Sequence, residues 1–252
     1  MILVLGGTSD SLRICEALNE LQLDYIVSVT TEYGKQLALK VTACILEGKM
    51  DNQQMIAFMK EKHIHLIIDA THPYAIEVSK NGMMSAQALS IPYVRYERPS
   101  LLEAIKDENL YVVQNTAEAC EVASQIGQNI FLGTGSKTLG EFIKALPDKN
   151  IIARVLPTSE VLKECEALGL NPDHIIAMKG PFSEEMNALL YKEYAIDCMI
   201  TKESGNEGGF LEKIRPCKQL GIRTIVIKRA GLAYPCVYHE IKELIACIET
   251  LR

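Results

Sequence analysis

Short apolar runs alternate with helical patterns along the first part of the chain. Each run has the length of a strand buried on both faces, and the stretch after it places apolar residues at helical spacing. The five runs cover residues 2–5, 25–30, 43–46, 66–69 and 93–95. Strands that alternate with helices form a parallel, doubly wound sheet. Residues 1–98 are therefore predicted to fold as a Rossmann-like α/β domain.

The same alternation starts again after a polar connection at residues 99–109, which is interpreted as a linker. The second half of the chain ends in a helical pattern at residues 241–248. Its strand-like runs cover residues 110–113, 129–132, 151–155, 174–178, 196–200 and 224–227. The predicted fold class is therefore α/β, with a second Rossmann-like doubly wound parallel-sheet domain at residues 110–252. The active site is expected in the cleft between the two domains.

Local signals predict where several helices begin. Asp51 opens a capping-box pattern, and Ser159 and Ser183 are predicted N-caps of two helices in the second half. Pro73 suits the first position of the helix that follows residues 66–69. Pro216 falls inside a later helical pattern, where it should kink the helix or cost about 3 kcal/mol.

The formal charge of −6 is spread along the chain rather than gathered in blocks. This argues against sequence-independent binding of nucleic acid, so an anionic ligand would have to meet a local cluster of cations. The eight cysteines show neither a C-x-x-C motif nor a Cys/His metal spacing, which predicts buried, reduced thiols and no metal site. No apolar run approaches the roughly 18 residues of a membrane span, and the chain starts without a charged signal segment. We expect a soluble, cytoplasmic protein.

A glycine pair follows the first strand and precedes a helix. Gly6 and Gly7 would let the backbone approach a pyrophosphate, while Thr8 or Ser9 could cap the helix whose N–H groups face the anion. The three-glycine fingerprint of dinucleotide-binding folds is absent. The alternative is a tight turn into an ordinary helix of an α/β fold.

The ends of the next two strands supply further candidate cofactor residues. Thr30, Thr31 and Glu32 follow the second strand, near the place where an acidic side chain commonly accepts the ribose 2′-hydroxyl of NADH. An exposed loop carboxylate is the alternative for Glu32, so the preference for NADH over NADPH is slight. Gly48 is predicted to line the adenine side of the site.

The strand at residues 66–69 ends in polar groups. Asp69 closes the strand, and Thr71 and His72 follow it. Ligands of open α/β sheets bind outside the carboxyl ends of the strands. We therefore expect these three residues beside the nicotinamide end of a bound dinucleotide.

His72 is the first candidate catalytic residue, because an imidazole titrates near neutral pH and can deliver a proton. The alternative is an imidazole that hydrogen-bonds its own turn. Tyr74 and Lys202 are the other candidate catalytic residues, and Glu203 is a further candidate acid.

Polar or cationic residues follow the strands of the second half at positions that would share one edge of a parallel sheet. Such a basic rim suits a ligand with several carboxylates, although each cation taken alone could be solvated surface. The candidate substrate-binding residues are Gly135, Ser136, Lys137, Arg154, Lys179, Lys202, Glu203, Ser204, Gly205 and Arg229. Residues 205–209 are interpreted as a mobile loop that closes over the ligand or as a flexible connector.

Several of these motifs, in this order, resemble the precorrin-6A and cobalt-precorrin-6A reductase family. The motifs are Gly-Gly-Thr at 6–8, Asp-Ala-Thr-His-Pro-Tyr at 69–74, Arg-Pro at 98–99, residues 154–157, Gly-Pro-Phe at 180–182, Lys-Glu-Ser-Gly at 202–205 and Gly-Gly at 208–209. The chain departs from the family pattern at Ala230, Pro216 and Leu101.

The resemblance implies a reductase of vitamin B12 biosynthesis. In that family a hydride from NADH or NADPH goes to C19 of a tetrapyrrole and a proton goes to C18. The substrate carries many acetate and propionate arms, which agrees with the basic rim. Any cobalt belongs to the substrate, and Glu32 and the cysteines lean toward the cobalt-containing one.

Two other classes of protein remain open at this point. A sugar or ketone reductase is disfavoured because the Tyr-x-x-x-Lys pair of one large group is missing: Tyr74 is followed by Val78 in place of lysine. A redox-sensing module would hold a dinucleotide without catalysis. We expect no nucleic-acid or membrane partner, and a monomer and a homodimer are both compatible with the sequence.

Overall fold

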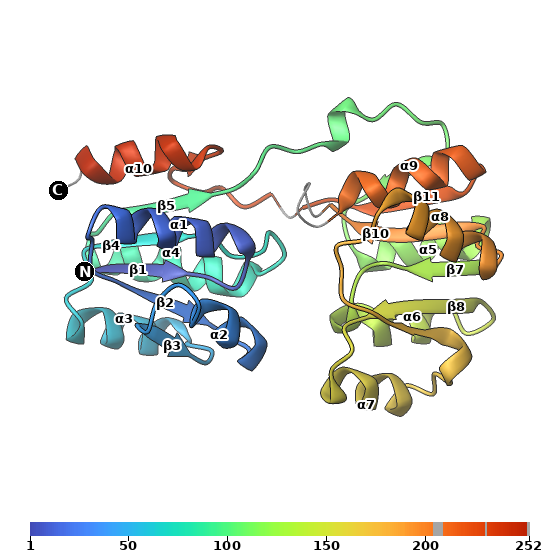
Figure 1. The fold of residues 1–252 in the computed structure, drawn as a ribbon, viewed down its shortest axis with the longest axis horizontal. Helices are drawn as coiled ribbons and strands as arrows, with labels where there is room; N and C mark the ends of the chain where they lie inside the picture. The colour runs from blue at the N-terminus through green and yellow to red at the C-terminus, as the bar shows by residue number, and fades with distance from the viewer. Residues whose placement is uncertain (204–208, 230, 251–252) are drawn as a thin grey trace. The chain divides into compact units, whose positions relative to one another are not determined.

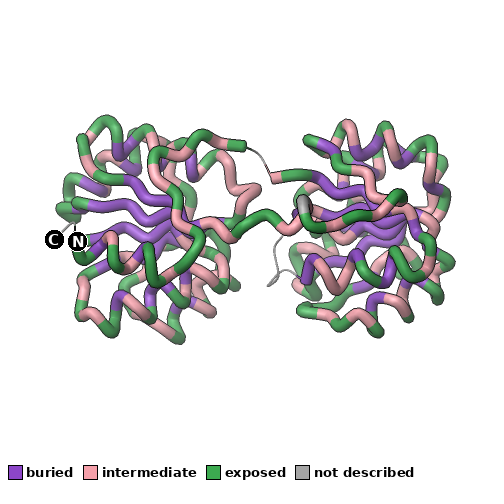
Figure 2. The backbone as a smooth tube through the Cα atoms, turned by 90° about the horizontal axis from the view of Figure 1, so that it is seen from above, coloured by how far each residue is buried: buried purple, intermediate pink, exposed green. Residues whose placement is uncertain are grey.

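The computed structural model describes residues 1–203, 209–229 and 231–250, and its chain divides into two compact units (Figure 1). The first unit comprises Met1–Pro99 and Ala230–Arg252, and the second comprises Ser100–Arg229. Each unit is built on a six-stranded sheet, and every strand pairing described is parallel. Buried residues line the strands of each unit (Figure 2). The predicted fold class, with two Rossmann-like α/β domains, is confirmed.

The sheet of the first unit has the strand order β3-β2-β1-β4-β5-β12. Its strands are β1 (Ile2–Leu5), β2 (Tyr25–Val29), β3 (Ile45–Glu47), β4 (Leu66–Asp69), β5 (Tyr93–Tyr96) and β12 (Val237–Tyr238). The chain runs outward from β1 to β3 and returns to β4 on the other side of β1. Ligands of open α/β sheets bind at the carboxyl ends of the strands that flank such a reversal. We call the ends of β1 and β4 the first switch point.

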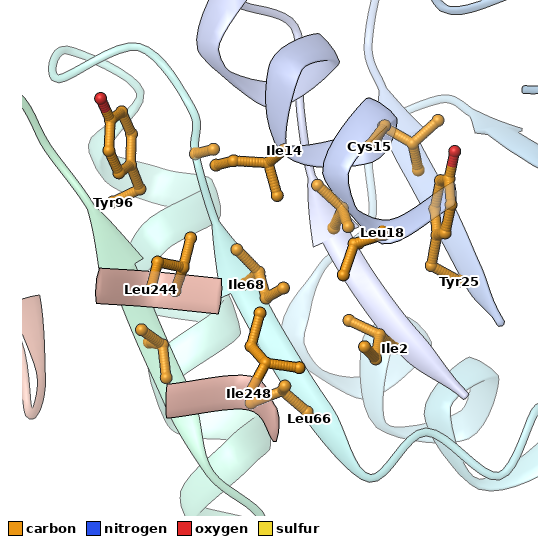
Figure 3. Close-up of a cluster of buried hydrophobic side chains, with 14 of the residues drawn as sticks. Ile2, Ile14, Cys15, Leu18, Tyr25, Leu66, Ile68, Tyr96, Leu244 and Ile248 are labelled. Carbon is orange, nitrogen blue, oxygen red and sulfur yellow. The ribbon is translucent and has the colours of Figure 1, made fainter. Parts of the chain in front are cut away.

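Helices cover both faces of this sheet. One face carries α1 (Ser9–Glu20), α2 (Glu32–Ala38) and α10 (Ile241–Thr250), and the other carries α3 (Asn52–Glu61) and α4 (Ile76–Leu89). Side chains alternate between the two faces of a strand. Ile2 and Val4 of β1 therefore lie in the hydrophobic core on the α1 side of the sheet, which we call the α1 core, whereas Leu3 and Leu5 lie in the core on the α3 side. Figure 3 shows the α1 core, in which Leu244 of α10 lies near the strands.

The prediction that residues 110–252 form the second domain is wrong for the C-terminal segment. β12 extends the first sheet by pairing with β5, with Val237 opposite Arg95. Leu244 and Ile248 of α10 are buried in the core of the first unit. The physical reason is the apolar face of α10, which completes the core that α1 leaves open. The first unit is thus made from both ends of the chain.

The sheet of the second unit has the strand order β6-β11-β10-β7-β8-β9. Its strands are β6 (Leu110–Val113), β7 (Asn129–Leu132), β8 (Asn150–Val155), β9 (Ile175–Ala177), β10 (Cys198–Lys202) and β11 (Arg223–Ile227). The chain runs from β7 out to β9 and returns to β10 on the other side of β7. The ends of β7 and β10 form the second switch point.

The helices of the second unit pack against this sheet and define its core. They are α5 (Thr116–Ile126), α6 (Leu139–Ala145), α7 (Ser159–Ala167), α8 (Glu184–Glu193) and α9 (Phe210–Leu220), with short 3₁₀ turns η1 (Leu102–Ala104), η2 (Ser136–Thr138) and η3 (Pro172–His174). Phe131 of β7 packs with Tyr191 of α8 and Phe210 of α9. Leu101 and Ile105 pack against the same core, so residues 99–109 are not a separate linker, contrary to the prediction.

Three of the predicted helix signals are confirmed. The Asp51 side chain accepts the N–H of Gln54 and caps α3. The Ser183 side chain accepts the N–H of Met186 and caps α8. Pro216 lies inside α9.

Two predicted helix starts are wrong. Thr158 rather than Ser159 caps α7, because its side chain accepts the N–H of Val161. α4 begins at Ile76 rather than at Pro73. The reason is that residues 72–75 close a turn of their own, in which the N–H of residue 75 donates to the carbonyl of residue 72 at 2.8 Å.

The described part of the chain contains no helix that is long and apolar enough to cross a membrane. It also contains no group of three or more His, Cys, Asp or Glu side chains arranged to hold a metal ion. All eight cysteines are free thiols, and five of them are buried as predicted. Cys44 is exposed, whereas Cys236 and Cys247 are partly buried.

Candidate functional site

The first switch point is built from a glycine turn. A Cβ added to Gly6 would lie 2.8 Å from Cγ2 of Val27, so only glycine lets the turn sit this close to β2. Gly7 has φ +101, a conformation that disfavours other residues, and a Cβ there would meet no atom within 4 Å. The turn is therefore tight against the sheet on one side and open on the other. An open glycine turn before a helix can receive a phosphate.

The start of α1 is fixed by a capping box and by a bond across the switch point. Oγ1 of Thr8 accepts the N–H of Ser11 at 3.1 Å and donates to the carbonyl of Ala70 at 2.7 Å. The turn after β1 is thus tied to the turn after β4. Asp10, in the first turn of α1, binds Arg98 and also Arg13. These cations offset a carboxylate that would otherwise repel an anion at this helix end.

The other predicted cofactor residues of the first unit also follow strands of its sheet. Thr30 and Thr31 come directly after β2, and Thr31 caps α2 by accepting the N–H of Gly34 at 3.0 Å. Glu32 is the first residue of α2, its side chain is 63% exposed, and it lies 3.9 Å from the Lys35 ammonium. Gly48 follows β3 with φ +120. These residues share the carboxyl edge of the sheet with the glycine turn.

The side chain of Asp69, which was predicted to bind the cofactor, is buried among protein groups. Its side chain is 0% exposed and accepts hydrogen bonds from Thr71, Ser79, Tyr93 and Arg95. Burial and the charge of Asp69 raise the pKa of Tyr93 well above its usual range, so the phenol stays protonated and donates. The acidic group at the end of β4 was expected to meet solvent or ligand, but a buried arginine on β5 holds it inside.

Thr71 is buried and His72 is exposed, so adjacent residues of one turn have different surroundings. Nδ1 of His72 accepts the N–H of Tyr74 at 3.4 Å, and the two rings lie 5.5 Å apart. This is the local hydrogen bond expected from the alternative interpretation of His72. The imidazole retains an exposed edge, and both aromatic residues lie on the turn after β4.

The second switch point carries cations. Nζ of Lys202, the last residue of β10, donates to Oγ1 of Thr138 at 3.3 Å, which ties β10 to the turn after β7. Burial lowers the pKa of Lys202, and the neighbouring Lys137 lowers it further against the opposing effect of Glu141. Lys137 and Gly135 are exposed on that turn and Ser136 is partly buried beside them.

A pocket of about 360 Å³ lies beside this switch point, between the ends of β7 and β8 and helix α9. Arg154 of β8 is 7% exposed and lines it. The guanidinium is stacked on Phe182 at 4.1 Å and on Phe131 at 5.0 Å, and its Nη1 donates to Oδ1 of Asn187 at 2.7 Å. Aromatic faces and one amide therefore hold the cation in place at the pocket wall.

Lys213 of α9 lines the same pocket. Burial and the charge of Arg154 together lower the pKa of Lys213 to about 8, against the opposing effect of Glu212. Its neighbours therefore oppose the charged form of the ammonium, and a carboxylate in the pocket would reverse that effect. Two cations that face one small pocket favour an anionic group there.

Glu203 and Arg229 pair with each other. Glu203 is 1% exposed, its Oε2 accepts the N–H of Arg229 at 3.3 Å, and the Arg229 guanidinium lies 3.7 Å from its Oε1. The expectation that Glu203 contacts the substrate is not supported, because it is buried and fixes Arg229. Lys179 is exposed after the edge strand β9. Ser204 and Gly205, also predicted to bind substrate, lie outside the described residues.

Sequence reasoning missed several residues of these two sites. Lys213 was hidden in a helical pattern of mixed charge, and Asn187 looked like a surface residue of α8. Arg95 was predicted only as the end of a strand, and Tyr234 was not singled out. Only Phe182 carried a signal, since it lies in the Gly-Pro-Phe motif after β9.

Comparison with known proteins gives a consistent picture. The family model described as precorrin-6x reductase CbiJ/CobK matches residues 1–249. The cobalt-precorrin-6A reductase of Salmonella typhimurium is 40% identical over 90% of this chain and 87% of its own length. That of Priestia megaterium is 37% identical over 97% of this chain and 96% of its own length.

A solved structure of CobK precorrin-6A reductase superimposes with a TM-score of 0.80 at 19% identity, covering 99% of this chain and 96% of that one. This likeness supports the two-unit fold. The family match extends over nearly the whole chain and includes both switch points. The chain therefore belongs to the precorrin-6x reductase CbiJ/CobK family.

Proposed function

We propose that the protein is a cobalt-precorrin-6A reductase, which transfers a hydride from a reduced nicotinamide cofactor to the precorrin macrocycle. The observation that carries the proposal is the pocket lined by Arg154 and Lys213, in a chain whose family reduces precorrins. Precorrins carry many carboxylate arms, and a buried arginine beside a partly buried lysine in an acidic protein fits such a ligand.

The first unit is the proposed cofactor site. Gly6 and Gly7 allow the close approach that a pyrophosphate needs, and Thr8 and Ser9 begin the helix whose N-terminus faces it. Thr30, Thr31, Glu32 and Gly48 follow the neighbouring strands and are the proposed adenosine side. The turn at residues 71–72 is the proposed nicotinamide side. When bound, the reduced nicotinamide supplies the hydride.

The second unit is the proposed tetrapyrrole site. Arg154 and Lys213 would bind one carboxylate arm in their pocket, because a fixed guanidinium pairs well with a carboxylate. Lys137, Lys202 and Arg229 lie at other strand ends of the same sheet edge and would bind further arms. The Glu203 carboxylate keeps the Arg229 guanidinium in position for this task.

The reaction also needs a proton at C18 while the hydride goes to C19. Three groups of the chain are candidates to hold that proton. His72 and Tyr74 lie on the turn after β4, and Lys202 has a pKa lowered by burial, which makes its ammonium a better acid. Replacing each in turn and recording the pH profile of kcat would distinguish them, because only loss of the true acid removes its limb from the profile.

The direct experiment is to mix the protein with NADH or NADPH and with cobalt-precorrin-6A, and to follow the nicotinamide absorbance. A reductase oxidises the cofactor in proportion to the tetrapyrrole added. A redox-sensing module would bind the cofactor and leave it reduced, and a sugar or ketone reductase would ignore the tetrapyrrole. Cobalt-free precorrin-6A in a parallel assay decides whether the metal of the substrate matters.

A further inference from the structure

One buried carboxylate in the first unit receives an unusual number of hydrogen bonds. Oδ1 of Asp69 accepts the N–H of Thr71 at 2.9 Å, Oγ1 of Thr71 at 2.7 Å and Nη1 of Arg95 at 2.7 Å. Oδ2 accepts hydrogen bonds from the hydroxyl of Ser79 at 2.6 Å and from the phenol hydroxyl of Tyr93. The donors come from the turn after β4, from α4 and from β5. The carboxylate thus joins three elements at the end of β4.

The consequence for the turn is strong restraint on Thr71. Both its N–H and its hydroxyl donate to Asp69, and Nη1 of Arg95 also donates to the hydroxyl oxygen at 3.0 Å. The residue before it, Ala70, donates its N–H to the carbonyl of Leu5, and its own carbonyl accepts a hydrogen bond from the hydroxyl of Thr8. The position of Asp69 therefore sets the position of the turn after β4 and, through Ala70, its bond to the glycine turn.

The same cluster contacts the C-terminal segment of the chain. The Arg95 guanidinium lies 5.1 Å from the centre of the Tyr234 ring, which stacks on Tyr93 at 6.5 Å with an interplanar angle of 7°. The N–H of Arg95 also donates to the carbonyl of Cys236 at 2.8 Å. Tyr234 and Cys236 belong to the stretch that precedes β12. Arg95 therefore contacts both Asp69 and the segment that completes the first sheet.

We propose that Asp69 and Arg95 form a positioning pair, which holds the Thr71 turn in the geometry required at the nicotinamide side and links that geometry to docking of Tyr234. The proposal rests on the proposed function. Neither residue contacts the reacting atoms. They act on the site indirectly. They hold the N–H and the hydroxyl of Thr71 in place, and the hydrogen bond between Thr8 and Ala70 connects this turn to the glycine turn. Displacement of a reacting group by about 1 Å can cost on the order of 100-fold in rate.

The first test replaces Asp69 with Asn, which keeps the shape of the side chain and removes its charge. We expect the rate of hydride transfer in a single turnover to fall about 100-fold, while the dissociation constant of the tetrapyrrole changes less than about twofold. Rates are expressed per tetrapyrrole-binding site, so that a smaller fraction of folded protein does not lower the measured rate. The matched control is Ser85→Ala, which removes a buried hydroxyl of α4 that accepts Nδ2 of Asn52 at 2.9 Å, away from the turn.

A second readout does not depend on activity. In the cofactor-free protein, amide hydrogen exchange at residues 70–72 should quicken at least about tenfold in Asp69→Asn and stay unchanged in Ser85→Ala, because Asp69 accepts the Thr71 N–H. A merely structural role would lower the melting temperature in both variants. It would leave the local exchange and the transfer rate per site alike in both.

A milder variant decides the outcome if Asp69→Asn does not fold. Tyr234 is only partly buried, and Tyr234→Leu removes the ring that lies against Arg95 while leaving Asp69 in place. We expect the transfer rate per site to fall about tenfold. The proposed role of Asp69 and Arg95 would be rejected if Tyr234→Leu, and Asp69→Asn where it folds, transferred hydride at the wild-type rate per tetrapyrrole-binding site. If the wild-type protein itself transfers no hydride to the tetrapyrrole, the proposed function fails instead, and the exchange experiment still reports on the turn.

Discussion

The two switch points share a backbone design and differ in charge. In each, a side chain crosses between the two central strand ends: Thr8 bonds Ala70 in the first unit, and Lys202 bonds Thr138 in the second. The first relies on glycine, hydroxyl groups and helix N–H groups, with its carboxylate buried. The second presents Arg154, Lys202 and other cations at its edge. One sheet topology can therefore present two chemically different surfaces, because the side chains at the strand ends set the charge there.

The units also differ in how the chain completes them. The second unit is one continuous segment, whereas the first needs α10 from the far end of the chain. Leu244→Ala should therefore destabilise the first unit by about 2–5 kcal/mol, the usual cost of removing a fully buried leucine side chain. Urea unfolding can be monitored separately in each unit by hydrogen exchange. The unfolding midpoint of the first unit should fall to a lower urea concentration, and that of the second unit should not change.

The control for this prediction is Leu189→Ala on α8, a leucine that is 66% exposed. It should change the stability of either unit by less than about 0.5 kcal/mol. Equal destabilisation of both units by Leu244→Ala would mean that they unfold together, and the contrast between them would be lost.

Removing the guanidinium of Arg154 tests the charge of the second switch point. Arg154→Ala should raise KM for the tetrapyrrole about 10-fold to 150-fold, since a hydrogen bond between charged groups contributes about 1.5–3 kcal/mol. Cofactor affinity, measured by titration with NADH, should not change. Arg215→Ala is the control, because Arg215 lies on the same helix as Lys213 but pairs with Glu184 in an exposed ion pair. A cofactor defect in Arg154→Ala would contradict the division of tasks.

The pKa of Lys213 gives a prediction for the pH dependence of substrate binding. The free protein has a pKa of about 8 at this site, and a bound carboxylate would raise it. Since the complex holds the proton more tightly, the dissociation constant of the tetrapyrrole should be flat below about pH 8 and should rise above it. The pH profile of kcat/KM measures this, because it reports groups of the free enzyme. Lys213→Met should bind more weakly at pH 7 and lose the rise.

The smallest effect is expected at the first switch point. Glu32→Ala should weaken NADH binding about fivefold, because one hydrogen bond contributes about 1 kcal/mol. The same change should improve NADPH binding, because it removes a negative charge near the 2′-phosphate. Fluorescence titration with each cofactor gives both constants. Glu47→Ala, which also removes a carboxylate beside Lys35, is the control and should not change the ratio. Equal effects of both variants would show that only the general charge matters.

Much of the fold could be predicted because its signals are local and repeated. The strands at residues 2–5 and 66–69 are dense apolar runs, and the caps at Thr8 and Asp51 lie where the residue types indicate. The pairing of β12 with β5 could not be predicted, since it joins Val237 to Arg95 across an intervening unit. Two residues carry no periodicity, and the apolar face of α10 would suit either sheet.

The candidate sites divide in the same way. Gly7 follows the end of β1 by two residues and Arg154 lies near the end of β8, so their place at the sheet edge followed from the strand prediction. The burial of Asp69 was not predicted, because a carboxylate at a strand end looks accessible and its partner Arg95 lies on the neighbouring strand. Lys213 was missed because its surroundings come from β8 and from the Phe182 loop, which are remote in sequence.

The route of the chain also sets the order of events during synthesis. Strand β5 leaves the ribosome with one edge unpaired, because its partner β12 follows only after residues 100–229. At about 5–20 residues per second, this delay is on the order of ten seconds. A strand edge exposed for that time invites pairing with a neighbouring nascent chain. The second unit can fold meanwhile, so newly made molecules pass through a stage in which one half is finished and the other awaits its last helix.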